Sequence, residues 1–174
     1  MKRMNVSLSV VALGMAIVTA CGGSGAAEGT IEITGEDYSF AGVPELVAPG
    51  AELTFTNASA VEVHEIVVLK IADGEERPLD ELLALPEAES DALVESQGVL
   101  IALPEADGAN PEGSGSSIEV TEPGRYAVVC FIPQGADPAV VEEAMAGEAE
   151  GPPDMGDGTP HAFLGMVGEF EVEG

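Results

Sequence analysis

The sequence has few basic residues and few aromatic ones. Five lysines and arginines stand against 32 aspartates and glutamates, which gives the 174 residues a formal net charge of −27. A chain with this charge repels the phosphate backbone of nucleic acids, so nucleic-acid binding is excluded. Direct adsorption to anionic lipid is disfavoured for the same reason. Tryptophan is absent and aromatic residues make up 4% of the chain. The core must therefore consist mainly of Val, Leu, Ile and Ala.

Apolar residues, by contrast, are plentiful. They make up 45% of the chain, and the mean hydropathy is +0.22. This composition lies outside the range typical of intrinsically disordered chains, which combine high net charge with low hydrophobicity. The length left after a short N-terminal segment, about 150 residues, suits one domain that buries roughly two thirds of its chain surface.

Residues 1–20 are predicted to be an export signal. Lys2 and Arg3 precede an apolar stretch over residues 6–20, which has the length and polarity of a secretory signal and is too short to span a bilayer comfortably. No acidic residue lies in this segment. Its removal would leave three basic residues against 32 acidic ones, a formal net charge of −29.

The predicted signal ends in Val18-Thr19-Ala20-Cys21, followed by glycines and a serine. This sequence resembles the lipobox of bacterial lipoproteins, which implies cleavage before Cys21 and acylation of that residue. An ordinary signal peptide with a coincidental cysteine is the alternative. We expect an extracytoplasmic protein, anchored by lipid on Cys21 to the membrane of a bacterial or archaeal cell, with residues 21–28 as a flexible tether.

The remaining chain has the pattern of an all-β protein. Short runs of alternating apolar and polar residues, separated by turn-forming residues, are typical of a β-sandwich or barrel. The strongest run covers 61–71, where apolar residues on both faces predict a central strand that is covered on both sides. In the closing run, Phe170 and Val172 are expected to face inward. The further predicted strands cover residues 31–34, 52–57, 117–121, 125–132 and 167–172.

Two segments interrupt this pattern. Residues 72–115 contain two predicted helical stretches, near 78–83 and 87–97, but too few apolar residues for a core of their own. Residues 131–160 include Asp137 and Pro138, which predict the N-cap and first residue of a helix. We expect a single domain over residues 29–174, with insertions at 72–115 and 131–160.

Four residues offer the donor atoms of a metal site. With Cys21 assigned as the anchor, Cys130 is a lone thiol in an oxidising compartment, where it needs burial or a ligand. Together with His64, His161 and Met166 it supplies one thiolate, two imidazoles and one thioether. That set matches a blue-copper site, in which two His and one Cys bind in a plane and a Met binds weakly. The alternatives are a redox thiol or a small buried hydrophobe for Cys130, a core residue for Met166, and ordinary strand or surface roles for the histidines.

The segments around these residues resemble those of the cupredoxins, the plastocyanin-like family. Residues 62–65, Glu-Val-His-Glu, are similar to the segment with the first His ligand, and residues 123–126, Pro-Gly-Arg-Tyr, to the strand that leads to the Cys ligand. The five-residue step from His161 to Met166 is the one that plastocyanin-like members use. Residues 30–56 look like the first strands of bacterial members. The resemblance covers most of residues 29–173 once 72–115 is set aside.

The resemblance implies both a fold and a site. The fold is an all-β Greek-key sandwich or barrel of about seven to eight strands with short helical insertions. The site is one type 1 copper, held by His64, Cys130, His161 and Met166. The chain departs from the family pattern in two places. Thirty residues, rather than a few, separate Cys130 from His161, and Glu65 stands where members often have Asn.

The function implied by the resemblance is electron transfer and not enzymatic catalysis. Copper in such a site carries single electrons between extracytoplasmic redox partner proteins. The acidic excess fits an ordinary solvated surface, an adaptation to a salt-rich habitat or a docking face for a basic redox partner, and the sequence leaves all three open. Two alternatives stay open. One is a metal-free cupredoxin-like lipoprotein that acts as a binding or structural module through its two insertions. The other is periplasmic copper storage or delivery with the same ligands.

Overall fold

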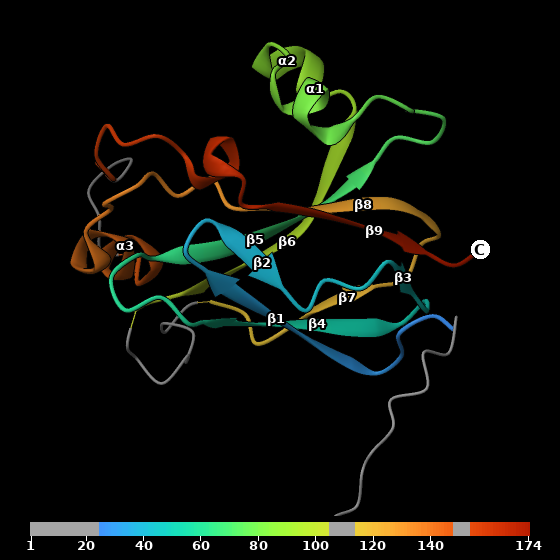
Figure 1. Ribbon diagram of the computed structural model, residues 1–174, viewed down its shortest axis with the longest axis horizontal. Helices are drawn as coiled ribbons and strands as arrows, with labels where there is room; N and C mark the ends of the chain where they lie inside the picture. The colour runs from blue at the N-terminus through green and yellow to red at the C-terminus, as the bar shows by residue number, and fades with distance from the viewer. Residues whose placement is uncertain (1–24, 105–113, 148–153) are drawn as a thin grey trace, which may run out of the picture.

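The computed structural model describes residues 25–104, 114–147 and 154–174, and these form two β-sheets packed face to face (Figure 1). The all-β sandwich predicted from the sequence is confirmed, with nine strands in the described residues. One sheet runs in the order β2 (Ser39–Ala41), β1 (Thr30–Glu36), β4 (Ala51–Asn57) and β7 (Ile118–Val120). The other runs in the order β3 (Leu46–Val47), β9 (Val167–Val172), β8 (Gly124–Val129), β5 (His64–Ile71) and β6 (Val94–Ala102).

The core lies between the two sheets because each strand turns alternate side chains inward. On β9, Phe170 and Val172 are buried while the glutamates beside them are exposed, as expected from the sequence. Phe170 stacks on Tyr126 at a ring-centroid distance of 5.2 Å. The Tyr126 hydroxyl donates to the backbone oxygen of Glu122, so this fully buried phenol is satisfied. The rest of the core is aliphatic, with Ile31, Ile33, Leu53, Ile66, Val68 and Leu100 among its members.

Strand β5 is covered on both faces, which confirms the reading of its apolar pattern. Its inner face carries Ile66 and Val68 into the sandwich core. Its outer face is covered by α1 (Leu79–Leu83), whose buried Leu79 and Leu82 belong to one apolar cluster with Leu69. Figure 1 shows α1 on this outer side of the sheet, next to α2 (Glu87–Ser90). The strand starts at His64, three residues later than the pattern suggested.

The helix predicted over residues 87–97 is wrong in its second half. The structure ends α2 at Ser90 and starts β6 at Val94, which pairs with β5 along its whole length, from His64 with Ala102 to Ile71 with Val94. The free edge of β5 offers unpaired backbone groups, and satisfying them overrides a local helical preference. The segment 72–115 thus contributes an edge strand to the second sheet as well as two short helices.

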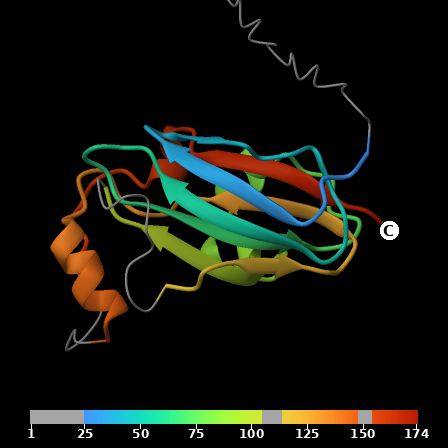
Figure 2. The ribbon, with the colours of Figure 1, turned by 90° about the horizontal axis from the view of Figure 1, so that it is seen from below.

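Helix α3 (Pro138–Met145) lies at one end of the sandwich, on the left in Figure 2. Its predicted start is confirmed, since the Asp137 side chain accepts a hydrogen bond from the Ala139 backbone at 2.9 Å and Pro138 occupies the first turn. The buried Val141 of this helix joins an apolar cluster that includes Cys130 and Met166. Helix α3, in the long segment after Cys130, therefore packs against this end of the sandwich.

Candidate metal centre

Strand pairing places His64 and Cys130 at the same edge of the second sheet. Strands β5 and β8 are antiparallel neighbours, with Val67 opposite Val129. The first residue of β5 therefore lies close to the residue that follows β8. The backbone N–H of Glu65 points to the Cys130 sulfur, with a nitrogen–sulfur distance of 3.5 Å. This contact links the two strand ends directly.

His161 reaches the same edge although thirty residues separate it from Cys130. The two ends of this segment pair with each other through an isolated bridge between Pro133 and Pro160. The backbone N–H of His161 donates to the Ile132 oxygen at 3.0 Å, and that of Ala162 donates to the Cys130 oxygen at 2.7 Å. Closure entropy rises only with the logarithm of loop length, so a long excursion can be closed by such a short ladder. The short helix η1 (His161–Leu164) begins at the histidine itself.

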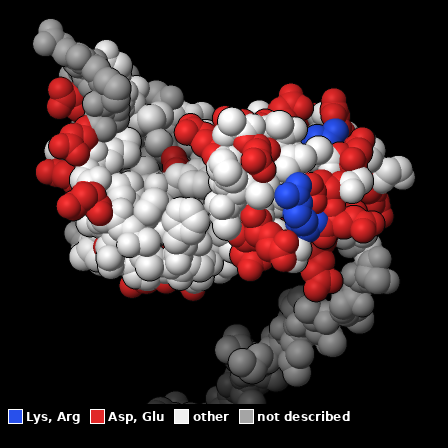
Figure 3. All heavy atoms as spheres, turned by 90° about the horizontal axis from the view of Figure 1, so that it is seen from above, with Lys and Arg blue, Asp and Glu red and all other residues white. Residues whose placement is uncertain are grey.

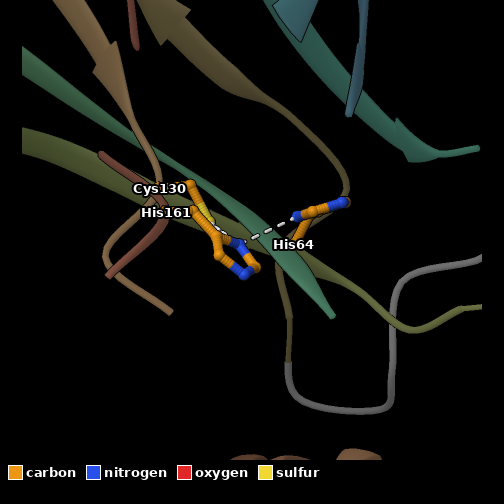
Figure 4. A group of neighbouring side chains, drawn as sticks. All are labelled: His64, Cys130 and His161. Carbon is orange, nitrogen blue, oxygen red and sulfur yellow. Dashed lines mark hydrogen bonds between the residues drawn. The ribbon is translucent and has the colours of Figure 1, made fainter. Parts of the chain in front are cut away.

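The three side chains converge (Figure 4). The Nδ1 atoms of His64 and His161 are 3.2 Å apart, and the Cys130 Sγ is 3.4 Å from the His161 Nδ1. One potential ligand atom from each of the three residues lies within 4.8 Å of those from the other two. Each of the three residues has 0% exposure. Two imidazoles and one thiol thus meet in a site that excludes water.

Met166 lies at the same end of the sandwich. Its side chain is fully buried in the apolar cluster that contains Cys130, and its backbone oxygen accepts from the Cys130 N–H at 3.3 Å. Its own N–H donates to the His161 oxygen at 3.0 Å, so the main chains of all three residues are tied together. Cys21, the predicted lipid anchor, lies outside the described residues.

A glycine makes room for the first imidazole. A Cβ atom added to Gly35, on β1, would come within 3.1 Å of the His64 Cβ and 3.2 Å of its Cδ2. It would also meet the Phe55 ring at 2.9 Å. The His64 ring is therefore packed between the sheets against a strand that carries no side chain at the contact.

Glu65 has a structural role that sequence reasoning missed. Its buried carboxylate accepts a hydrogen bond from the Phe131 backbone N–H at 3.0 Å, while its own N–H points to the Cys130 sulfur. Glu65 thus clamps the chain directly after the cysteine. Burial raises the pKa of this carboxyl group above its ordinary value, and the backbone donors partly oppose that rise. The sequence feature that could have indicated this role is a carboxylate next to His64, on the face of a central strand that is covered on both sides.

Burial keeps the site uncharged in the metal-free protein. It lowers the pKa of His64 to about 4, with the neighbouring His161 adding to the effect, and it also lowers the pKa of His161. Burial raises the pKa of the Cys130 thiol to about 12. At neutral pH the site therefore holds two neutral imidazoles and a thiol, and a bound metal ion would have to displace the thiol proton.

The pKa of His64 predicts how the stability of the metal-free protein depends on pH. Between about pH 6.5 and pH 4 the unfolded chain binds a proton at residue 64 and the folded chain does not, so protons favour unfolding. The free energy of unfolding is expected to fall as pH is lowered through this window, by about 3 kcal/mol from His64 alone. Urea titrations at several pH values measure the slope.

The matched control for this prediction is His64→Leu, which places an apolar side chain in the space of the imidazole. Its stability is expected to depend less steeply on pH, because the group that binds the proton is gone. Equal slopes for the variant and the natural chain would assign the pH dependence to other groups.

The donor set fits a metal ion, and copper in particular. The Nε2 atoms of His64 and His161 are buried without a hydrogen-bond partner, while both Nδ1 atoms face the site. Thiolate and thioether ligands suit Cu(I), and imidazole suits Cu(II), so a set of this kind can hold both oxidation states. The described part of the chain contains this one cluster of His, Cys, Asp and Glu with donor atoms close enough for a metal.

No protein-family model matches the chain, and no curated protein sequence does. Among solved structures, the chain is similar to a dithionite-reduced auracyanin from the photosynthetic bacterium Roseiflexus castenholzii, with 22% identity over 86% of this chain and 100% of that one, and a TM-score of 0.43. It is also similar to auracyanin A, a "blue" copper protein from Chloroflexus aurantiacus, with 19% identity over 84% and 100% of the two chains and a TM-score of 0.42. A multi-copper oxidase from Pediococcus acidilactici has 11% identity over 99% of this chain and 31% of its own, with a TM-score of 0.37.

Proposed function

We propose that the protein is an exported, lipid-anchored copper protein that carries single electrons between redox partners outside the cytoplasm. The observation that carries this proposal is the convergence of His64, Cys130 and His161 in a site without water access, where one ligand atom from each residue lies within 4.8 Å of the other two. The resemblance of the surrounding segments to cupredoxins supports it and supplies Met166 as the weak fourth ligand.

In this proposal the chain holds the metal and keeps its surroundings rigid. The two Nδ1 atoms and the Cys130 sulfur would hold the ion, and the Cys130 thiol would lose its proton on metal binding. Copper would supply a reversible change between two oxidation states. The backbone ties between Cys130, His161 and Met166 keep the ligands in place during that change. With four donors spent on the metal, no strong position is left for a substrate, so we infer that the protein is not an enzyme.

The charge of the described residues supports a basic partner. The three basic side chains among them are all paired with carboxylates: Lys70 with Glu122, Arg77 with Glu75 and Arg125 with Glu169. Figure 3 shows acidic side chains crowded over the half of one face that lies away from α3, and a largely uncharged area over the other half. A redox protein with a basic rim around its docking face would be steered to such a surface.

The proposed membrane attachment rests on the sequence around Cys21. No helix among the described residues is long and apolar enough to cross a bilayer. Acylation of Cys21 would hold the domain at the outer face of a membrane through the tether. Mass spectrometry of the N-terminal peptide from cells is expected to show a chain that begins at an acylated Cys21.

An absorption spectrum after addition of one equivalent of Cu(II) tests the copper proposal. An intense band near ~600 nm is expected, because a Cys thiolate bound to copper absorbs there. Voltammetry of the loaded protein is expected to show a reversible one-electron couple. Tight Cu(I) binding without such a couple would favour storage or delivery, and a featureless spectrum with no gain in thermal stability would favour a metal-free binding module.

A further inference from the structure

Glu62 lies in the loop between β4 and β5, two residues before His64, and its carboxylate is held at both oxygens. Oε2 accepts a hydrogen bond from the Gly135 N–H at 2.9 Å, and Oε1 accepts one from the Tyr38 hydroxyl at 3.3 Å. The side chain is 13% exposed. The loop itself is fixed, since the Asn57 side chain donates to the Glu62 backbone oxygen at 2.8 Å. The carboxylate therefore has a defined position between three separate segments of the chain.

This carboxylate faces the outer nitrogen of His161. Oε2 lies 3.6 Å from the His161 Nε2, an atom that is buried and makes no hydrogen bond at this distance. Among the described residues, no other carboxylate oxygen lies within 4.0 Å of an imidazole nitrogen. His64 thus has no such contact, although its Nε2 is equally buried and without a partner.

Tyr38 completes the cover over His161. Its ring meets the imidazole edge-on at a centroid distance of 5.1 Å, and its hydroxyl accepts from the Gln134 side chain at 2.7 Å. Among the residues that the structure describes, Tyr38 is the only non-glycine residue with a positive φ, which is 60°. Backbone strain of this kind persists where the surrounding structure requires it. Here it accompanies a turn that brings the phenol onto both Glu62 and His161.

A neutral imidazole carries one proton, and the position of that proton decides which nitrogen can bind a metal. A carboxylate beside Nε2 favours the tautomer with hydrogen on Nε2, since this N–H would point to a fixed negative charge. The Nδ1 lone pair is then free. Nδ1 is the atom of His161 that lies 3.4 Å from the Cys130 sulfur and 3.2 Å from the His64 Nδ1.

We propose that Glu62 is a positioning residue for His161, which keeps the proton on Nε2 in the metal-free protein and leaves Nδ1 available as a ligand. The second consequence rests on the proposed copper function. A fixed negative charge behind one ligand favours Cu(II) over Cu(I), because the ion with the higher charge gains more from it. Glu62 thereby lowers the reduction potential of the loaded site.

Two variants separate the hydrogen-bonding role of Glu62 from its charge. Glu62→Gln keeps an oxygen that accepts from Gly135 and faces His161, but removes the negative charge. Glu62→Ala removes the acceptor as well. Glu173→Gln is the matched control, because it removes one negative charge from an exposed position after β9, near the C terminus at the opposite end of the molecule from α3 (Figure 1).

Nitrogen-15 NMR of the imidazole rings in the metal-free protein tests the tautomer without any copper. The natural chain and Glu62→Gln are expected to show His161 with hydrogen on Nε2, and Glu62→Ala is expected to show both tautomers. Hydrogen on Nδ1 in the natural chain would overturn the proposal. This measurement stands even if copper does not bind, and the natural chain alone decides it if Glu62→Ala fails to fold.

The copper-loaded protein tests the electrostatic role of the Glu62 charge. Glu62→Gln is expected to lose about tenfold in Cu(II) affinity relative to Cu(I), the lower end of the range for residues behind metal ligands. For a one-electron couple this is a rise in potential of about 59 mV. Glu173→Gln is expected to change the potential far less. Equal potentials for the two variants would overturn the assigned electrostatic role.

Discussion

Replacing Cys130 with serine is expected to abolish the intense band near ~600 nm completely, because this band requires a thiolate bound to copper. A serine hydroxyl is a poor ligand for Cu(I) and stays protonated at neutral pH, so affinity for both oxidation states is expected to fall. The fold should persist. The sulfur is fully buried, but a hydroxyl of similar size can accept the Glu65 N–H that now points to it.

The matched control for this variant is Ala136→Ser. Ala136 is buried in the same apolar cluster as Cys130, so the change adds a buried hydroxyl there while the thiol remains. This control is expected to lose some stability and to keep the blue band. Circular dichroism and thermal unfolding of both metal-free variants verify the fold. A blue band that survives in Cys130→Ser would falsify the assignment of Cys130 as the copper ligand.

Gly158→Ala is expected to separate His161 from Cys130. A Cβ atom at residue 158 would lie 2.1 Å from the Gln134 backbone oxygen and 2.9 Å from the Gln134 nitrogen. Both are main-chain atoms next to the short ladder that closes the 131–160 segment, so the two strands of that ladder must move apart. Overpacking of this kind costs about 1–3 kcal/mol of stability. The displaced imidazole is expected to lower Cu(II) affinity by about 10–100-fold, as when residues that orient ligands are lost.

Gly25→Ala provides the comparison, because no heavy atom lies within 4 Å of the Cβ position at that residue. It is expected to change neither the melting temperature of the metal-free protein nor its affinity for Cu(II). Thermal unfolding and a competitive copper titration measure both quantities. If Gly158→Ala behaved like Gly25→Ala, the contact with Gln134 would not be needed to hold His161 in place.

Local patterns predicted those features that depend on residues near one another in the chain. Alternation predicted the inward side chains of β9, and an Asp-Pro pair predicted the start of α3. Strand β6 was missed because its residues Val94 to Gln97 also fit a helical pattern. The pairing that decides their conformation is with β5, more than twenty residues earlier.

At the site, the contacts of Glu62 and Glu65 also depend on residues that are distant in the sequence. In the sequence they are two carboxylates on either side of a histidine, among 32 acidic residues. In the structure one faces the outer nitrogen of His161 and the other holds the backbone after Cys130. Both partners lie more than sixty positions further along the chain, so no local pattern could assign these contacts.

The sequence by itself determined the acidic character of the protein, its all-β class and the donor groups available for a metal, which are two imidazoles, the Cys130 thiol and thioethers that include that of Met166. These follow from residue types and from periodicities of a few residues. Only the tertiary structure decided that these donors meet. His64 and His161 are 97 positions apart in the chain, and their Nδ1 atoms lie 3.2 Å from each other. Cys130 and His161 are 31 positions apart, and the sulfur lies 3.4 Å from the His161 Nδ1. Such distances depend on strand pairing and loop closure, which are non-local and which the identity of the donor atoms does not encode.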